Sequence, residues 1–277
     1  MNGTEETTMV KSKLGGSYSL NAVFSVKEFG IFLGLVALFV TFSIISPTFI
    51  TFNNIMNIIR QISILGIISV GMTMVIVSGE IDLSVGSVYG MAGMITAVSM
   101  VNGVPVFPAA LLGILSGGLA GIINGVLVTY LRVPALIVTL GMMYIARGIA
   151  YLTTGGLVVT LSRRFIKDPA LDNFIFLGRG KIFDVIPSMS MAFVAVAVIG
   201  YFIYHKNIIG YRMRAVGGNA DAARVSGLNV EFVKIAAFTI TGLLAAFGGI
   251  INCSFLNTGQ ATAGMSLELD VDRKSVV

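Results

Sequence analysis

The sequence contains a single cysteine, Cys253, and a single histidine, His205, among its 277 residues. One cysteine cannot form an intrachain disulfide, and one of each residue is too few for a zinc site of cysteine and histidine ligands. The same scarcity excludes most nucleophile–base pairs built on these side chains. We therefore expect no disulfide framework, no metal site and no catalytic residues, in a protein that is not an enzyme.

Charged residues are scarce as well. They make up 11% of the chain and hydrophobic residues make up 56%, whereas ordinary soluble domains have about 25% charged residues. This balance predicts an integral membrane protein. The formal net charge is +5, and most lysines and arginines stand at the edges of apolar runs, where they meet lipid headgroups. We expect membrane lipid, and not nucleic acid, around these charges.

A phosphate-binding loop of the form G-x-x-x-x-G-K-[ST] is absent, and the nearest approach to it is Gly180-Lys181-Ile182. Without such a loop the chain has no cradle for the phosphates of ATP. We expect the chain to bind no cofactor, so ATP-driven work would need a separate subunit.

A helix that crosses the bilayer needs about 20 apolar residues. Seven runs approach or exceed that length, at residues 29–46, 62–78, 83–101, 106–129, 134–152, 188–204 and 232–256. Helices fit these lengths and the strands of a barrel do not. The sequence therefore predicts an all-α, polytopic transmembrane bundle of about seven spans at residues 29–270, after a cytoplasmic tail at residues 1–28.

If the tail is cytoplasmic, alternating spans place Arg132 and the 205–231 loop inside and the 153–187 loop outside. The charge of the 153–187 loop runs against this arrangement, because basic residues prefer cytoplasmic loops. Its basic residues are Arg163, Arg164, Lys167, Arg179 and Lys181.

Two apolar runs meet at a short polar break, Ser78-Gly-Glu-Ile-Asp-Leu-Ser-Val-Gly-Ser87. Its carboxylates and hydroxyls can cap and charge the start of the next helix, which satisfies backbone donors that lipid cannot. Alternatively, a carboxylate at a helix break belongs to a transport pathway, as polar groups near broken helices do in transporters. Both roles stay open for the candidates Glu80, Asp82, Ser84 and Gly86.

The fourth run carries glycines at four-residue spacing, Gly113, Gly117, Gly121 and Gly125. This spacing leaves bare backbone along one helix face and predicts close packing against a neighbouring helix.

The tetrapeptide Gly-Ile-Ile-Asn occurs twice and ends at Asn124 and at Asn252, which hints at an internal repeat. An unpaired amide is costly in lipid, so we expect both side chains to face other helices or the pathway. Two arginines also adjoin apolar runs, Arg60 and Arg147. Both can snorkel to the interface, and Arg147 can instead point inward, where it could bind a polyol; the sequence leaves its direction open.

The longest polar run between two apolar segments is HKNIIGYRMRAVGGNADAARVSGLNV, residues 205–230. Gly217 and Gly218 are expected to form a turn that leads into a short helix. Asn219 can accept a hydrogen bond as the N-cap of that helix, and Gly227 can end it with a left-handed residue. On charge alone, this stretch could be only a basic cytoplasmic loop.

Three motifs resemble one family. GGNADAARVSGLNV resembles the coupling loop of the sugar permeases of ATP-binding-cassette importers, the ribose, xylose and galactoside class. GEIDLSVGSVYGMAG is similar to the Gly-x-x-Asp-Leu-Ser-Val-Gly-Ser signature of the same class, and TAGMSLELD is similar to its Gly-x-x-x-Glu-Leu-Asp stretch. The resemblance extends from about Ser46 to Asp270.

The resemblance implies a multi-pass permease subunit of the bacterial cytoplasmic (inner) membrane that carries a ribose-like pentose or related sugar. It implies three partners: an ATP-binding-cassette ATPase subunit that uses the ATP, an extracytoplasmic sugar-binding protein, and a second permease subunit, identical or closely related. The coupling loop, at about residues 205–231, would contact the ATPase. Its candidate contact residues are Gly217, Gly218, Asn219, Ala222, Ala223, Arg224, Ser226 and Gly227.

Three alternatives stay open at this point. An ion- or solute-coupled secondary transporter would need no ATPase, and a membrane scaffold would not transport at all. The third concerns the end of the chain. The family continues past Asp270 with a Gly-rich apolar segment and further spans, whereas residues 271–277 are charged. We expect a permease truncated at its C-terminus that does not transport as written, the alternative being a naturally short subunit that dimerises differently.

Overall fold

The computed structural model describes residues 27–265 and residue 267, and the side chains from residue 30 onward. The expected tail at residues 1–28, apart from its last two residues, and the atypical end at residues 271–277 lie outside this part. The chain divides into two compact units, Met1–Ile55 and Met56–Val277, which are described separately.

The first unit contains the apolar helix α3, Lys27–Ile45. The chain turns after Ser46, and Phe49 packs its ring against Phe39 with ring centroids 5.2 Å apart. Helix α4, Phe52–Val77, begins in this unit and continues into the second. We expected this span to begin near residue 62. That boundary is wrong, because the amphipathic stretch before it continues the same helix.

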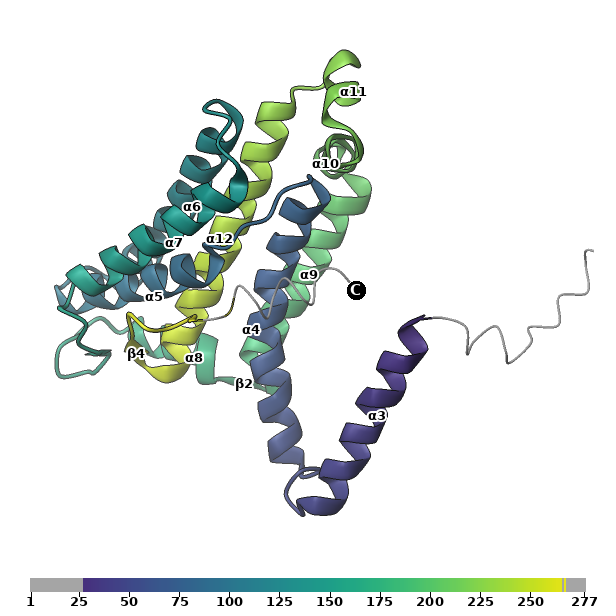
Figure 1. Cartoon of the computed structure of the whole chain (residues 1–277). Helices are drawn as coiled ribbons and strands as arrows, with labels where there is room; N and C mark the ends of the chain where they lie inside the picture. The colour runs from purple at the N-terminus through teal and green to yellow at the C-terminus, as the bar shows by residue number, and fades with distance from the viewer. Residues whose placement is uncertain (1–26, 266, 268–277) are drawn as a thin grey trace, which may run out of the picture. The chain divides into compact units, whose positions relative to one another are not determined.

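The second unit is a helical bundle with two pairs of very short strands (Figure 1). After α4 its helices are α5 (Val85–Val101), α6 (Val106–Thr129), α7 (Ala135–Leu152), α8 (Leu171–Arg179), α9 (Ser188–Lys206), α10 (Ile208–Gly218), α11 (Ala220–Val225) and α12 (Val230–Leu256). The antiparallel strand pairs are β1 (Val159–Thr160) with β4 (Thr258–Gly259), and β2 (Lys181–Ile182) with β3 (Ile186–Pro187).

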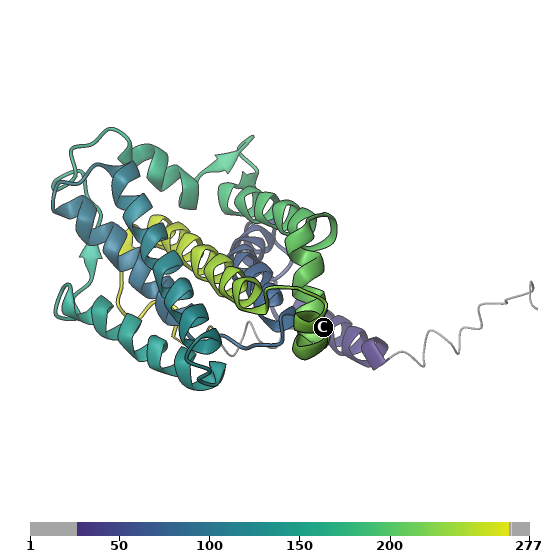
Figure 2. The ribbon, with the colours of Figure 1, turned by 90° about the horizontal axis from the view of Figure 1, so that it is seen from above.

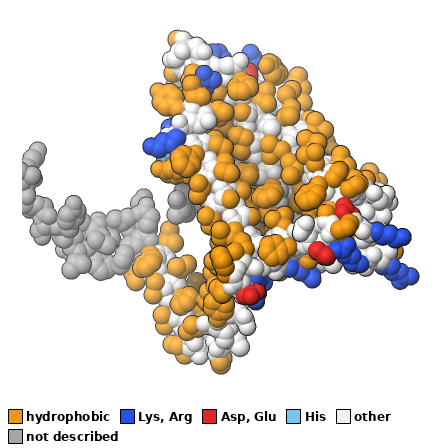
Figure 3. Space-filling model, turned by 180° about the vertical axis from the view of Figure 1, so that it is seen from behind, with side chains coloured by type: hydrophobic (Ala, Val, Ile, Leu, Met, Phe, Trp, Pro, Cys, Tyr) orange, Lys and Arg blue, Asp and Glu red, His pale blue; other side chains and the backbone are white. Residues whose placement is uncertain are grey.

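Every apolar run expected from the sequence is a helix, which confirms the polytopic all-α bundle. Among the described residues, five helices are long and apolar enough to cross a membrane: α4, α6, α7, α9 and α12. The other two runs, in α3 and α5, form shorter apolar helices. Hydrophobic side chains cover the side of the bundle, and charged side chains gather toward its ends (Figure 3).

Helix α12 runs through the middle of the second unit, with α5 and α6 on one side and α4 and α9 on the other (Figure 2). Three glycines of the α6 ladder, Gly117, Gly121 and Gly125, face it, whereas Gly113 lies chiefly against α5. A Cβ atom at Gly121 would overlap the carbonyl oxygen of Phe238, and one at Gly117 would overlap that of Gly242. A Cβ at Gly242 would in turn overlap the carbonyl oxygen of Gly117. The two backbones therefore touch along a seam that leaves no room for side chains.

The helices alternate in direction, so the connecting segments gather at two ends of the bundle (Figure 1). We call one the α11 end, which contains residues 78–81, 130–134 and 207–229. The other is the α8 end, which contains residues 102–105, 153–187 and 257–260. Residues 261–265 return from the α8 end toward the start of α5. The gathering of Arg132 and the 205–231 loop at one end, opposite the 153–187 loop, agrees with the alternation expected from the sequence.

Candidate functional site

Three asparagines shape the polar stretch at the α11 end. Asn207 accepts a hydrogen bond from the backbone N–H of Ile209 at the start of α10. Asn219 accepts one from Ala222 at 2.9 Å and begins α11, and Asn229 accepts one from Phe232 at 2.8 Å and begins α12. These caps satisfy donors that would otherwise lack partners. Within one polar run, the three caps thus mark where α10, α11 and α12 begin.

The short helix expected after Asn219 is therefore present as α11, and Gly227, with φ +83°, follows its end. The turn expected at Gly217 and Gly218 is wrong, because both residues complete α10. A Cβ at Gly217 would overlap the carbonyl oxygen of Val77 at the end of α4. Glycine at position 217 thus permits a backbone contact between α10 and α4, which its neighbour Gly218 does not make.

Helix α11 and the residues that follow it expose small, uncharged side chains next to the charged Asp221 and Arg224. Ala222, Ser226 and Gly227 are exposed, and Val225 is 91% exposed. Ala223 was expected to face a partner as well, but it is buried in the apolar cluster that contains Val230 and Val233. The sequence reasoning missed Val225, for which the signal was an apolar residue on a short helix between polar neighbours.

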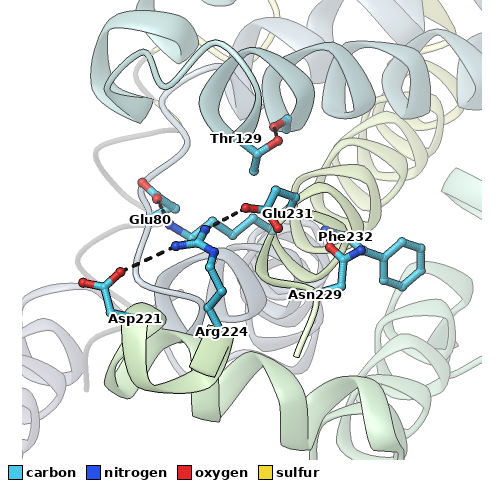
Figure 4. A network of polar contacts seen from close by, with 9 residues as sticks. Glu80, Thr129, Asp221, Arg224, Asn229, Glu231 and Phe232 are labelled. Carbon is cyan, nitrogen blue, oxygen red and sulfur yellow. Dashed lines mark hydrogen bonds and ion pairs between the residues drawn. The ribbon is translucent and has the colours of Figure 1, made fainter. Parts of the chain in front are cut away.

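An ion pair joins α11 to α12 (Figure 4). The guanidinium group of Arg224 lies 2.7 Å from a carboxylate oxygen of Glu231 and 3.5 Å from one of Asp221. A second ion pair joins α12 to the polar break that follows α4. There the ammonium group of Lys234 donates to Glu80 at 2.5 Å, and the two side chains are only 19% and 17% exposed.

The two pairs meet on the first turns of α12, because Glu231 and Lys234 are three residues apart and lie on one face. The start of α12 therefore connects α11 with the polar break. The sequence reasoning selected Glu80 and Arg224 but missed both of their partners. Lys234 stands inside the last apolar run, Glu231 stands just before it, and no motif marks either residue.

Asp82, in the polar break, belongs to a separate buried cluster. One oxygen of its carboxylate accepts hydrogen bonds from the backbone N–H of Ser84 at 2.8 Å and from its hydroxyl group at 2.6 Å. The Asn124 amide of α6 donates to the Ser84 hydroxyl at 3.0 Å. Asp82, Ser84 and Asn124 are thus brought together across two helices. The amide oxygen of Asn124 is buried and has no partner among the described residues.

The structure does not bring the second asparagine of the repeat to this cluster. Asn124 lies near the end of α6 and Asn252 lies near the end of α12. Because these two helices run in opposite directions, their ends lie at opposite ends of the bundle. Asn252 is half-buried and makes no side-chain hydrogen bond to any described residue.

Arg147 of α7 points inward. Its guanidinium group donates to the carbonyl oxygens of Ala261 and Ala263 at 2.6 and 2.7 Å. The segment after β4 returns along α5, where Gly264 approaches the carbonyl oxygen of Gly86. Of the two directions left open for Arg147, the structure shows the inward one, and the side chain holds this returning segment rather than a free site.

Arg60, the other arginine beside an apolar run, is half-buried. It donates to Asn57 at 2.9 Å, and its guanidinium carbon lies 5.7 Å from the centre of the Phe255 ring. The Arg60 side chain thus contacts both its own helix, α4, through Asn57, and the neighbouring helix α12, through Phe255.

The basic residues of the 153–187 loop partly serve to fasten it. Arg163 pairs with Asp172 at 2.5 Å, and Arg179 donates to the carbonyl oxygens of Phe255 and Leu256 at the end of α12. Asp168 accepts hydrogen bonds from the backbone N–H groups of Val106 and Ala170, which lower the pKa of this carboxyl group. Such bonds stabilise the charged form.

A cavity of about 410 Å³ opens at the α11 end between α6, α11 and the start of α12. Its lining residues are Val128, Thr129, Tyr130, Arg132, Ala220, Arg224, Val230, Glu231 and Lys234. No group of three or more metal-ligating side chains occurs within the residues that the structure describes. The α11 end therefore offers a capped surface helix, two ion pairs to α12 and a basic cavity.

Comparison with known proteins gives one family and several relatives. Residues 54–272 match the family described as branched-chain amino acid transport system / permease component. The chain is 39% identical to the ribose import permease protein RbsC of Bacillus subtilis over 246 residues, which are 88% of this chain and 74% of the relative.

Two further relatives are similar. The ribose import permease protein RbsC of Haemophilus influenzae is 38% identical over 89% of this chain and 75% of its own length. The L-arabinose ABC transporter permease protein AraH of Azospirillum brasilense is 33% identical over 89% of this chain and 70% of its own length. No solved structure matches.

Proposed function

The chain belongs to the branched-chain amino acid transport system / permease component family, and from its relatives we propose that it carries a ribose-like pentose or related monosaccharide, driven by ATP hydrolysis in a separate subunit. Its relatives establish the coarser statement that it is a permease of an ABC sugar importer. With its apolar helices, it is a multi-pass protein of the bacterial inner membrane.

The observation that carries the ATP coupling is the surface of α11. This helix is held by its own asparagine cap at one end and by the Arg224–Glu231 pair at the other. Beside the charged Asp221 and Arg224, its exposed residues Ala222 and Val225 are small or apolar, which suits close approach of another protein. We assign α11 as the helix that contacts the ATPase, and the α11 end as the cytoplasmic end.

The substrate class rests on the relatives, two of which are named for ribose and one for L-arabinose. The family description names branched-chain amino acids instead. The proposed partners are an ABC ATPase, an extracytoplasmic sugar-binding protein and a second permease subunit. Within the polar break, the cluster of Asp82, Ser84 and Asn124 is the candidate for a role in the pathway, because buried polar groups at a broken helix are costly without a function.

The test is reconstitution in proteoliposomes of the permease that contains this chain, with the ATPase and the binding protein encoded beside it. We expect uptake of labelled ribose or arabinose that requires ATP, and no uptake of labelled leucine. Leucine uptake without sugar uptake would refute the sugar assignment. Sugar uptake that follows an imposed ion gradient in the absence of ATP would replace this proposal with a secondary transporter.

A further inference from the structure

The basic cavity at the α11 end is formed by the ends of membrane-spanning helices. Val128 and Thr129 belong to the last turn of α6, and Val230, Glu231 and Lys234 belong to the first turns of α12. Side chains at the ends of spanning helices lie at the depth of the lipid headgroups. The volume of about 410 Å³ falls in the range of small-molecule sites, about 300–1,000 Å³.

The lining carries more positive than negative charge. It contains three basic side chains, Arg132, Arg224 and Lys234, and one carboxylate, Glu231. Arg224 is paired with Glu231, and Lys234 is paired with Glu80 from outside the lining. The third cation, Arg132, makes no hydrogen bond or ion pair to any residue that the structure describes. Its charge nevertheless acts on Glu231, so one carboxylate, already paired with Arg224, faces two of the three cations of the lining.

The start of α12 adds to this field. A long helix carries a partial positive charge at its N-terminus, and α12 extends over 27 residues from the wall of the cavity. Guanidinium and ammonium groups together with a helix start favour a phosphate group, which accepts several charge-assisted hydrogen bonds at once.

The surroundings indicate that the phosphate belongs to a lipid. Tyr130, Leu131 and Phe232 are exposed beside the cavity, and aromatic and apolar side chains at this depth lie against lipid. We infer that the cavity binds the phosphate group of an anionic phospholipid, with Arg132 as the main ligand and Arg224 and Lys234 as further donors. Basic pockets between helices bind anionic headgroups on the cytoplasmic side, the side that the proposed function assigns to the α11 end.

This site adjoins α11 through Arg224. A phosphate near Arg132 and Arg224 would link the segment between α6 and α7 to α11, in addition to the link through Glu231. The lipid would therefore stabilise α11 in the position that the structure shows.

The test measures lipid binding directly and needs no transport. The full chain is purified in detergent and titrated with phosphatidylglycerol or with phosphatidylcholine, and bound lipid is counted by native mass spectrometry. A parallel titration uses inorganic phosphate and glycerol phosphate. Failure of the proposed transport function would leave this measurement unchanged.

The variants are chosen to keep the fold. Arg132 adopts a left-handed conformation with φ +55°, which asparagine tolerates better than most residues. Arg132→Asn therefore removes the charge with little backbone strain, and Arg132→Lys keeps the charge. The control is Lys206→Gln, which removes an exposed positive charge at the end of α9 outside the cavity lining.

We expect the wild-type chain to prefer phosphatidylglycerol, and Arg132→Asn to weaken that binding about fivefold, the effect of one basic residue near an anionic membrane. Arg132→Lys and Lys206→Gln should retain it. Equal losses in Arg132→Asn and Lys206→Gln, or equal binding of both lipids, would overturn the proposal. So would binding of the soluble phosphates in place of the lipid, or loss of the bound lipid when the ATPase is added, which would assign the cavity to the protein interface.

Discussion

Gly217 is required by its geometry: it lies in the last turn of α10, where the backbone of α4 passes too close for any side chain. Gly218, the next residue, has open space around its Cβ position. A pair of adjacent glycines therefore plays two different roles. The sequence shows the pair, and only the neighbouring carbonyl group of Val77 distinguishes its members.

Replacement of these glycines by alanine tests the distinction. Gly217→Ala should lower the free energy of unfolding by about 1–3 kcal/mol, because the added methyl group overlaps backbone that must move. Gly218→Ala should leave it nearly unchanged. Thermal unfolding of the two purified variants in the same detergent gives the comparison, and equal melting temperatures would contradict this account of Gly217.

The ion pair between Glu80 and Lys234 is the less exposed of the two pairs at the α11 end. Lys234→Gln should lower the free energy of unfolding by about 1–3 kcal/mol, because a half-buried carboxylate loses a charged donor. Asp172→Asn breaks a pair whose members are 46% and 76% exposed and should cost at most about 1 kcal/mol.

Chemical denaturation of both variants measures these losses. The double variant Glu80→Lys with Lys234→Glu should recover part of the stability, because the opposite charges meet again. The single variants Glu80→Lys and Lys234→Glu are measured beside it. If the double variant lost at least as much free energy of unfolding as the two single variants lose together, the ion pair would not explain either loss.

At the scale of elements, the seam of touching backbones sets the distance between α6 and α12. Gly121→Leu should prevent normal assembly, because a large side chain would stand where α12 backbone lies. Gly141→Leu is the matched control, since this glycine of α7 has open space around its Cβ position. Yield and monodispersity after detergent extraction measure assembly. Similar yields of folded protein from both variants would contradict the seam.

At the scale of the whole molecule, the alternating helices place α11 and the 153–187 loop at opposite ends. A cysteine at Ala222, which is exposed, should crosslink to the ATPase, whereas one at the buried Ala223 should not. The native Cys253 is buried and should give little background. Mass spectrometry of the crosslinked complex identifies the site.

The same cysteine reports the orientation of the molecule. We expect an impermeant thiol reagent to label position 222 in inverted membrane vesicles and not in intact cells. Labelling from outside intact cells would reverse the assignment of the two ends, and it would also remove the basis for placing the ATPase at α11.

Local patterns in the sequence determined the number of apolar helices and the start and end of α11. Runs of apolar residues predict helices because each backbone group must find a partner within its own segment in lipid. Asn219 and Gly227 mark the limits of α11 because capping depends on neighbours a few residues away. These features needed no knowledge of distant contacts.

The tertiary structure alone decided which residues meet. Asn124 and Asn252 share a tetrapeptide, yet only Asn124 lies beside Ser84, because α6 and α12 run in opposite directions. Arg147 holds the carbonyl groups of a segment more than a hundred positions later. Glu80 and Lys234 form an ion pair across a similar separation. Such contacts depend on how helices pack and in which direction each runs, and a linear pattern of residues does not contain that information.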